Sequence, residues 1–397
     1  MKARRQRNSD VSRQTTLFED RESMRLPNGC APRRPPHLRV RRIVLAKGSV
    51  ETPERRRFVE RICELYTEAD ILDQTNTPHN RIDLGREDAL ERHRLGKHTL
   101  VFGELRSAVR FSEEEGNTCP NYWHFSPYGF CPYGCKYCYL AGTPGVWFSP
   151  TIKIYVNLVE IMETMDQRAN ALAKPVPFYL GKLQDGLALD PLTAYSTLLI
   201  PFFAGHPYAR QVLLTKSASV ERLLDLDHQG HTTLSWSLNP PEIVREFEEN
   251  TPRVQERIEA MRLCAERGYP VRAVIMPVIP VHNWESVYVR FVKELLNTVP
   301  VERLTLGGIC IYRNALRLME RKIGVNNSVS ELLDCGARLA DGRRRFPAHV
   351  RLRLYGAVIN AAKEASPETE LALCLEEPDV WRKLGIEERV GKCNCVL

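Results

Sequence analysis

Apolar runs of strand length alternate with helix-length segments from Cys119 onward, and this alternation organises most of the chain. The pattern is typical of βα units around a parallel sheet. Such units favour an α/β fold in which an incomplete (β/α)6-type barrel presents polar loop residues at the carboxyl ends of its strands. The six predicted strands lie at residues 122–125, 177–182, 211–215, 233–238, 271–277 and 304–311.

Three further regions flank this barrel, which is assigned to residues 119–320. Residues 1–38 are rich in Arg and Pro and poor in aliphatic side chains, so we expect a disordered basic tail. Residues 39–118 predict a small N-terminal α/β unit, and residues 321–397 predict a C-terminal α/β appendage with a Cys-rich end. Their predicted elements are a strand at 43–46, a helix near 54–66, a strand at 98–102, a helix at 348–363 and a strand at 370–375.

Charge adds one question to this picture. The chain has 397 residues, of which 43% are hydrophobic, and a net charge of +7. Residues 1–50 carry +9 and the remainder carries −2. A basic arm of this kind either adds salt-dependent affinity for phosphate or is a solvated tail without a ligand. The start shows no secretory leader and the chain shows no apolar run of membrane-spanning length, so we expect a cytoplasmic protein with reduced thiols and no membrane partner.

The most specific motif directly follows the first barrel strand. Cys131, Cys135 and Cys138 place three thiols within eight residues of one loop. Three thiolates can bind three irons of a [4Fe–4S] cluster and leave the fourth iron without a protein ligand. That iron is free to bind S-adenosylmethionine, so that an electron from the reduced cluster releases a 5′-deoxyadenosyl radical, which abstracts hydrogen from unactivated carbon.

The residue before the last cysteine strengthens this interpretation. A C-X3-C-X2-C spacing with an aromatic residue at that place is the signature of radical S-adenosylmethionine enzymes. Here the aromatic residue is Tyr137, whose ring we expect to pack on the adenine. The alternative is a structural zinc knuckle completed by Cys119 or His124, although no second pair of ligands lies nearby in the sequence.

Further segments resemble the spore photoproduct lyases, radical enzymes that split a thymine dimer of spore DNA. They are Cys-Lys-Tyr-Cys-Tyr-Leu at 135–140, Val-Leu-Leu-Thr-Lys at 212–216, Trp-Ser-Leu-Asn at 236–239, Arg-Val-Gln-Glu-Arg-Ile-Glu-Ala at 253–260 and Gly-Tyr-Pro at 268–270. The resemblance implies that Lys216 meets the carboxylate of S-adenosylmethionine, that Ser237 hydrogen-bonds the cofactor and that Met276 lines the adenosine. It also implies a hydrogen-atom relay role for Tyr139 and an electron donor such as a flavodoxin or a ferredoxin.

The sequence departs from the lyases at the end of the second barrel strand. Lys182 stands where the family has a cysteine that returns a hydrogen atom to the product radical, and Gln184 replaces a serine that contacts the cofactor. An ammonium cannot donate a hydrogen atom as a thiol does, whereas the Gln amide keeps a donor and an acceptor for the cofactor. Lys182 either pairs with Asp185 or Asp190 as structural support, or binds an anionic group of the substrate and acts in catalysis.

Three functions are compatible with these residues. The first is a radical S-adenosylmethionine enzyme with a changed active site and an unassigned substrate, such as a nucleobase or nucleotide. The second is repair of a DNA thymine dimer with another hydrogen donor, either Tyr139 or a C-terminal cysteine. The third is a non-catalytic nucleic-acid-binding protein in which a metal site only stabilises the fold. Cys374, Cys393 and Cys395 also offer ligands for an auxiliary metal, or are unliganded thiols.

Overall fold

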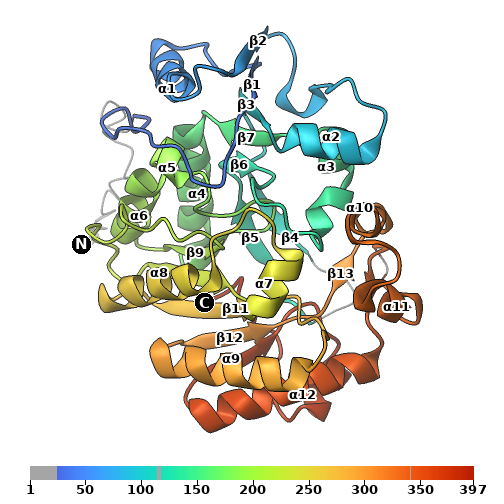
Figure 1. Cartoon of the computed structure of the whole chain (residues 1–397). Coiled ribbons are helices and arrows are strands. Elements are labelled where there is room, and N and C mark those ends of the chain that lie inside the picture. The colour runs from blue at the N-terminus through green and yellow to red at the C-terminus, as the bar shows by residue number, and fades with distance from the viewer. Residues whose placement is uncertain (1–24, 114–117, 340) are drawn as a thin grey trace, which may run out of the picture.

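A computed structural model describes residues 25–113, 118–339 and 341–397 of the chain, and its described part contains three β-sheets. The largest sheet has eight strands and lies in the middle of the molecule, and a five-stranded sheet lies at one end (Figure 1). The strand order of the large sheet is β16 (Glu370–Leu373), β12 (Arg303–Leu306), β11 (Val271–Ile275), β10 (Thr232–Ser237), β9 (Ala209–Thr215), β8 (Val176–Leu180), β5 (Tyr122–Phe125) and β4 (Val109–Ser112).

The six predicted barrel strands are all present and lie side by side in chain order. From β5 to β12 each strand pairs in parallel with the next. Every residue of β10 and of β11 is buried, as expected for parallel strands covered by helices. No pairing joins β4 to β16 in the part of the chain that is described, so the sheet is open. The α/β class is therefore confirmed, and its description as an incomplete barrel remains a prediction.

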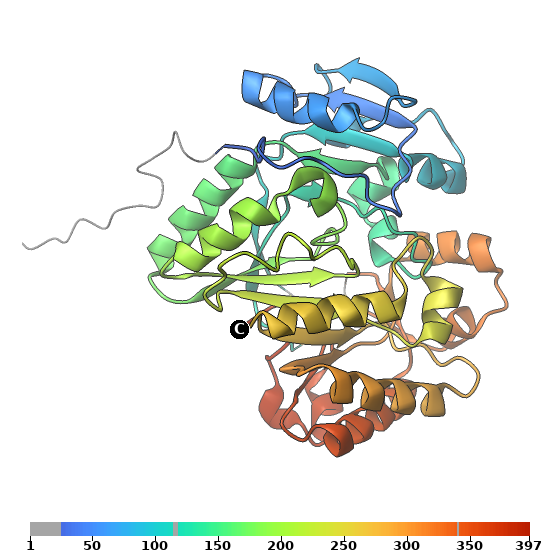
Figure 2. The ribbon, with the colours of Figure 1, turned by 60° about the vertical axis from the view of Figure 1, so that its left-hand side comes forward.

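Helices between the strands cover the large sheet, and α9 and α12 pack together at the end opposite the five-stranded sheet (Figure 2). The main helices are α4 (Leu158–Leu172), α6 (Ser196–Gly205), α7 (Pro241–Phe247), α8 (Val254–Glu266), α9 (Trp284–Thr298), α10 (Arg313–Ile323), α11 (Ser328–Asp334), α12 (Ala348–Ala365) and α13 (Pro378–Lys383). In α9 the buried side chains recur at helical spacing and form one apolar face. They are Val287, Tyr288, Phe291, Val292, Leu295 and Leu296. None of the helices described is long and apolar enough to cross a membrane.

The predicted N-terminal unit shares its sheet with later residues. The order of this sheet is β2 (Asp70–Gln74), β1 (Arg42–Ala46), β3 (Thr99–Gly103), β7 (Ile152–Tyr155) and β6 (Tyr128–Gly129), and the helices α1 (Pro53–Cys63) and α2 (Ala89–Gly96) accompany it. Two of these strands follow residue 118, while β4 precedes it and belongs to the large sheet. The unit is therefore not separated from the barrel at residue 118. Local sequence patterns do not reveal such non-local strand partners.

Part of the predicted disordered tail is ordered. Leu26 and Leu38 are buried in the main core, and the backbone N–H of Arg33 donates to the carbonyl of Pro191 at 2.8 Å. The prediction of disorder is therefore wrong for residues 25–38, because their few aliphatic side chains pack against distant elements. The remaining residues of this tail, 1–24, lie outside the described residues.

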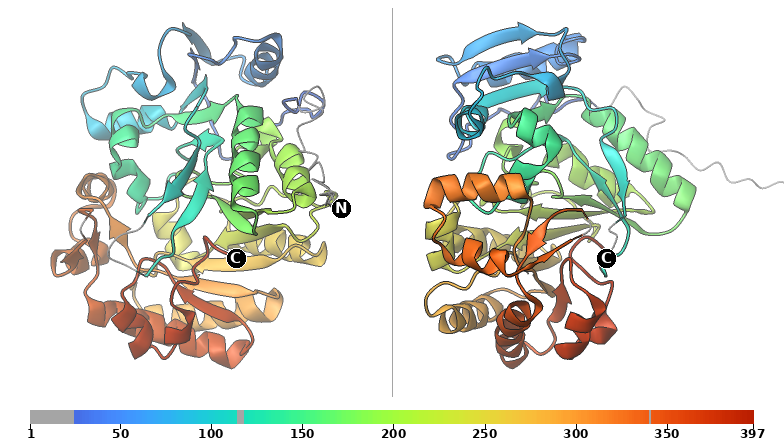
Figure 3. Two further views of the ribbon diagram at one scale, coloured as in Figure 1. Left: turned by 180° about the vertical axis from the view of Figure 1, so that it is seen from behind. Right: turned by 90° about the vertical axis from the view of Figure 1, so that its right-hand side faces the viewer.

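The predicted C-terminal appendage is likewise joined to the large sheet. Strand β16 pairs in parallel with β12, and the C-terminus lies against this sheet (Figure 3). Residues 310–311 of the last predicted barrel strand instead form β13 (Cys310–Ile311), which belongs to a small sheet with β15 (Arg344–Arg345) and β14 (Ala337–Arg338). Gly307 and Gly308 separate β12 from β13 at a point where an added Cβ would lie only 2.7–2.8 Å from neighbouring side chains.

Candidate active site

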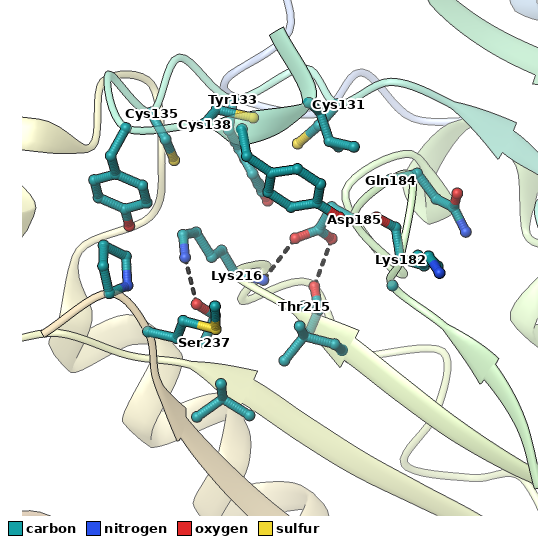
Figure 4. Close-up of a pocket in the computed structure, with 18 of the residues that line it drawn as sticks. Cys131, Tyr133, Cys135, Cys138, Lys182, Gln184, Asp185, Thr215, Lys216 and Ser237 are labelled. Atoms are coloured by element: carbon teal, nitrogen blue, oxygen red, sulfur yellow. Dashed lines mark hydrogen bonds between the residues drawn. The ribbon is translucent and has the colours of Figure 1, made fainter. Parts of the chain in front are cut away.

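A pocket lies at the carboxyl ends of the parallel strands, between the cysteine loop and the ends of β8 to β11 (Figure 4). Its empty volume is about 920 Å³ with the open mouth included. Every site residue predicted from the sequence lines this one pocket. These residues are Cys131, Cys135, Tyr137, Cys138, Tyr139, Lys182, Gln184, Lys216, Ser237 and Met276.

The cysteine loop is fixed by backbone hydrogen bonds to the last residue of α7 and to the segment that follows it. The N–H groups of Gly134 and Lys136 donate to the carbonyls of Glu249 and Phe247 at 2.7 and 2.8 Å. A Cβ at Gly134 would lie 3.0 Å from the Cβ of Glu249, so glycine permits this close approach. The three thiols of the loop are free and half-buried, and they line the pocket together. This donor set fits a [4Fe–4S] cluster with one iron left open.

The zinc-knuckle interpretation gains no support. No group of three or more His, Cys, Asp or Glu side chains within the described ranges is arranged to hold a metal ion. Three thiolates of an iron–sulfur cluster need no such common centre, because each binds a different iron. Cys119, one proposed fourth ligand, instead accepts a hydrogen bond at 3.3 Å from the backbone N–H of Leu375, and its thiol contacts those of Cys374 and Cys393.

Lys216 and Ser237 lie on the wall opposite the cysteine loop (Figure 4). The Lys216 ammonium donates to Ser237 Oγ, so the two predicted cofactor contacts touch each other. Its Nζ also lies 3.6 Å from Oε1 of Glu248, a residue whose side chain is completely buried. Glu248 pairs with Arg257 at 2.7 Å and accepts a hydrogen bond from the hydroxyl of Tyr137. Burial opposes ionisation of Glu248, but Lys216 and Arg257 hold the pKa of its carboxyl below the ordinary value.

Asp185 organises the floor of the pocket, a role that sequence reasoning did not assign to it. Its carboxylate accepts hydrogen bonds from the Thr215 hydroxyl and the Lys216 backbone N–H, both at 2.6 Å. It also accepts from the backbone N–H groups of Leu187 and Ala188 at 3.0 and 2.9 Å. Asp185 therefore ties the loop after β8 to the end of β9 and fixes the backbone of Lys216.

Gln184 lines the pocket, and its side-chain oxygen has no hydrogen-bond partner in the described structure. Its Nε2 donates to the carbonyl of Phe125 at 3.1 Å, whereas this oxygen, Oε1, is buried. A buried polar atom without a partner is costly, so this oxygen suits a ligand that brings an N–H or O–H donor. The observation fits the cofactor contact predicted from the family resemblance.

Tyr139 and Lys182 contact each other beside the pocket. The Tyr139 hydroxyl donates to the carbonyl of Lys182 at 2.6 Å, while the Lys182 ammonium donates to Ser112 Oγ and lies 5.2 Å from the ring centroid of Tyr122. Asp185 and Asp190, the two carboxylates considered as partners of Lys182, accept hydrogen bonds from other groups. Asp185 binds the groups described above, and Asp190 accepts at 2.8 Å from both the backbone N–H and the hydroxyl of Ser196.

One pocket cysteine was missed by the sequence analysis. Cys310 in β13 lines the pocket, and burial raises the pKa of its thiol to about 12, which keeps the S–H group intact. In the sequence it stands alone, with no second cysteine at a meaningful spacing. Only the tertiary structure brings it to the cofactor residues. Cys374, Cys393 and Cys395 are not among the residues that line this pocket.

A parallel α/β sheet that carries a three-cysteine loop and a pocket at its carboxyl edge is typical of the radical S-adenosylmethionine class of enzymes, and this chain is one of them. The sequence profile described as spore photoproduct lyase matches residues 50–309. The chain therefore belongs to the spore photoproduct lyase family.

Individual relatives agree with this assignment. The chain is 30% identical to the spore photoproduct lyase of Geobacillus sp. (strain Y412MC61) over 242 residues, which cover 59% of this chain and 68% of the relative. It is 29% identical to that of Bacillus subtilis (strain 168) over 227 residues, covering 56% and 64%. A solved structure of a mutant spore photoproduct lyase with bound AdoMet and dinucleoside spore photoproduct superposes with a TM-score of 0.74 at 23% identity, covering 85% of this chain and 99% of that one.

Proposed function

We propose that this enzyme abstracts hydrogen from a nucleobase or nucleotide in a pocket whose hydrogen-donor position has been changed to Lys182. The supporting observation is the convergence of the cluster cysteines, the cofactor contacts and Lys182 on one pocket. When bound, the [4Fe–4S] cluster and S-adenosylmethionine supply a carbon-centred radical that abstracts hydrogen from unactivated carbon. An electron donor such as a flavodoxin or ferredoxin completes the system.

The chain's own residues divide the work of holding the cofactor. Cys131, Cys135 and Cys138 are the cluster ligands. Lys216 binds the carboxylate of S-adenosylmethionine, and Glu248 orients this lysine through their ion pair. Gln184 accepts a hydrogen bond through its unpaired Oε1. Ser237, Tyr137 and Met276 line the rest of the cofactor site.

The proposed role of Lys182 is to bind the substrate. Its ammonium cannot supply a hydrogen atom, but it can bind phosphate or another anionic group next to the reacting carbon. Ser112 directs the ammonium from the edge strand β4, and Tyr139 hydrogen-bonds the backbone of Lys182. In this proposal Tyr139 relays a hydrogen atom between cofactor and substrate.

One observation favours a second function, repair of a thymine dimer in DNA with a relocated hydrogen donor. Cys310 brings a half-buried, protonated thiol to the same pocket from β13. In this case the thiol transfers its hydrogen atom to the product radical and is itself left as a thiyl radical, which Tyr139 can reduce by a further hydrogen-atom transfer. One electron from the electron donor and one proton then return the tyrosyl radical to tyrosine.

The test is anaerobic reconstitution followed by assays against damaged and undamaged DNA, RNA, nucleotides and nucleosides. The wild type should contain about four Fe and four sulfides per chain and form 5′-deoxyadenosine, and Cys135→Ala should abolish both. Lys182→Gln should raise KM for a phosphorylated substrate more than it lowers kcat. Lys174→Gln, at an exposed lysine before β8, is the matched control.

Three outcomes would change the proposal. Stoichiometric Zn in natively purified protein would exclude the radical chemistry. An equal KM for phosphorylated substrate in Lys182→Gln and wild type would remove the anion-binding role. Repair of lesion-containing DNA at a lyase-like rate, lost in Cys310→Ala, would establish the second function instead.

A further inference from the structure

The cysteine loop is held from behind by a lysine of the N-terminal region. Lys97 follows the last residue of α2, and its ammonium donates to the carbonyls of Cys131 and, at 2.6 Å, Tyr133. The same Nζ lies 3.7 Å from the ring centroid of Phe130, the residue that precedes the loop. Phe130 has a φ of 60°, so the chain turns sharply where it enters the loop. Two carbonyl oxygens and an aromatic face are all partners that favour a cation.

A lysine at the end of a helix usually turns back to the last carbonyls of its own helix. Lys97 instead hydrogen-bonds the carbonyl of Cys131, which lies 34 residues later in the chain. The contact therefore joins the cysteine loop to the N-terminal region, which has no other assigned function.

A second ammonium approaches the same thiols from the C-terminal side. Lys322 lies in the last turn of α10, the helix that packs against residues 139–142 directly after Cys138. The charge of Lys322 acts on Lys97 and Glu249 and on the thiols of Cys138 and Cys135. Both lysines are thus electrostatically coupled to the cluster ligands.

We propose that Lys97 is a positioning residue that fixes the shape of the cysteine loop and, together with Lys322, raises the reduction potential of the cluster bound there. The inference rests on the proposed cluster and adds what controls its reduction. Three thiolates already make this site negative, and reduction adds one more negative charge. Fixed ammonium groups in a partly buried site lower the cost of that charge, because there is little water to screen them.

The experiment compares reconstituted holoenzymes by redox titration monitored with electron paramagnetic resonance, together with iron and sulfide content. Lys97→Met keeps the length and the contact with Phe130 but loses the charge and the donors. It should give a more negative midpoint potential and a lower iron content than wild type, and Lys97→Arg should restore both. Lys322→Met should shift the potential in the same direction at normal iron content, because Lys322 is assigned only the electrostatic part.

Lys293→Met is the control, since Lys293 forms a surface pair with Glu364 on the far side of the sheet, where α9 packs against α12. Unshifted potentials in both Lys97→Met and Lys322→Met would overturn the electrostatic role. If Lys97→Met fails to retain a cluster, Lys322→Met still decides that role. A wild-type protein that binds no cluster would refute the proposed function itself, whereas a normal wild-type cluster with unshifted variants refutes only this inference.

Discussion

At the scale of single residues, the buried side chain of His124 makes the stability of the protein depend on pH. His124 lies in β5, its Nδ1 is buried without a hydrogen-bond partner in the described structure, and its pKa is lowered to about 4 by burial and by the charges of Lys182 and Arg110. The unfolded chain takes up this proton near pH 6.5, whereas the folded protein does not until about pH 4. Stability contributed by neutral His124 is therefore present at pH 7 and is lost as the pH falls below about 6.5.

This leads to a prediction for acid stability. The free energy of unfolding of the wild type should fall between pH 7 and pH 5, and His124→Gln should reduce that fall by about 2 kcal/mol. Urea unfolding at the two pH values measures the difference. His349→Gln, at an exposed histidine, should leave the fall unchanged. An equal fall in wild type and His124→Gln would show that this residue is not the neutral buried base described here.

At the scale of elements, the C-terminal segment holds three strands of the large sheet together. Arg303 in β12 donates to the carbonyl of Cys393 at 2.9 Å, and Arg272 in β11 donates to that of Val396 at 2.6 Å. Ser235 in β10 donates to Oδ1 of Asn394 at 2.8 Å, and both of these residues are buried. The end of the chain therefore packs against β10, β11 and β12, and the thiol of Cys393 contacts that of Cys119.

The hydrogen bond to Asn394 gives a prediction at this scale. Asn394→Ala leaves the Ser235 hydroxyl buried without its partner, so it should lower the free energy of unfolding by about 1–3 kcal/mol. It should also speed the reaction of the buried Cys393 with a thiol reagent. Asn326→Ala, at an exposed position, is the control for both measurements. Unchanged stability together with unchanged Cys393 reactivity would contradict the described anchoring.

At the scale of the whole molecule, nucleic-acid binding would depend more on where the basic residues lie than on the net charge of the chain. Residues 1–24 carry a net +2, whereas residues 25–50 contain seven Lys and Arg and no acidic residue. The basic segment is thus packed on the molecule, and its residues 35–38 line a second pocket that also reaches Tyr133 behind the cysteine loop. Five arginines of this segment are exposed, and four of them lie close together in the sequence: Arg33, Arg34, Arg39 and Arg41.

If the substrate is part of a nucleic acid, these four arginines should contribute to binding. Replacing all four with Gln should weaken duplex DNA binding and reduce the slope of log affinity against log salt by about 0.9 for each phosphate that no longer has a basic partner. Deletion of residues 1–24 should change the slope much less. Titrations at several salt concentrations measure both. If deletion of residues 1–24 strongly weakens DNA binding and the four substitutions do not, DNA binding depends on residues 1–24 and not on these arginines.

The sequence by itself predicted the three-cysteine loop, the order of the six parallel strands and ten of the residues that line the pocket. These features are local: three thiols in eight residues identify their own chemistry, and hydrophobic runs of strand length identify their own elements. Polar residues at the ends of parallel strands converge by the rules of the fold, which is why Lys216 and Ser237 were found although 21 residues separate them in the chain.

Only the tertiary structure decided which distant segments meet. It joined β6 and β7 to the N-terminal sheet, and it brought Lys97 to the cysteine loop and Cys310 to the pocket. It also placed Cys119, considered from the sequence as a fourth zinc ligand, against the C-terminal cysteines. Such contacts depend on strand pairing and packing between residues far apart in the chain, for which a single sequence carries no local signal. For the same physical reason the sequence identified how the radical is made, while the structure supplied the residues proposed to control it.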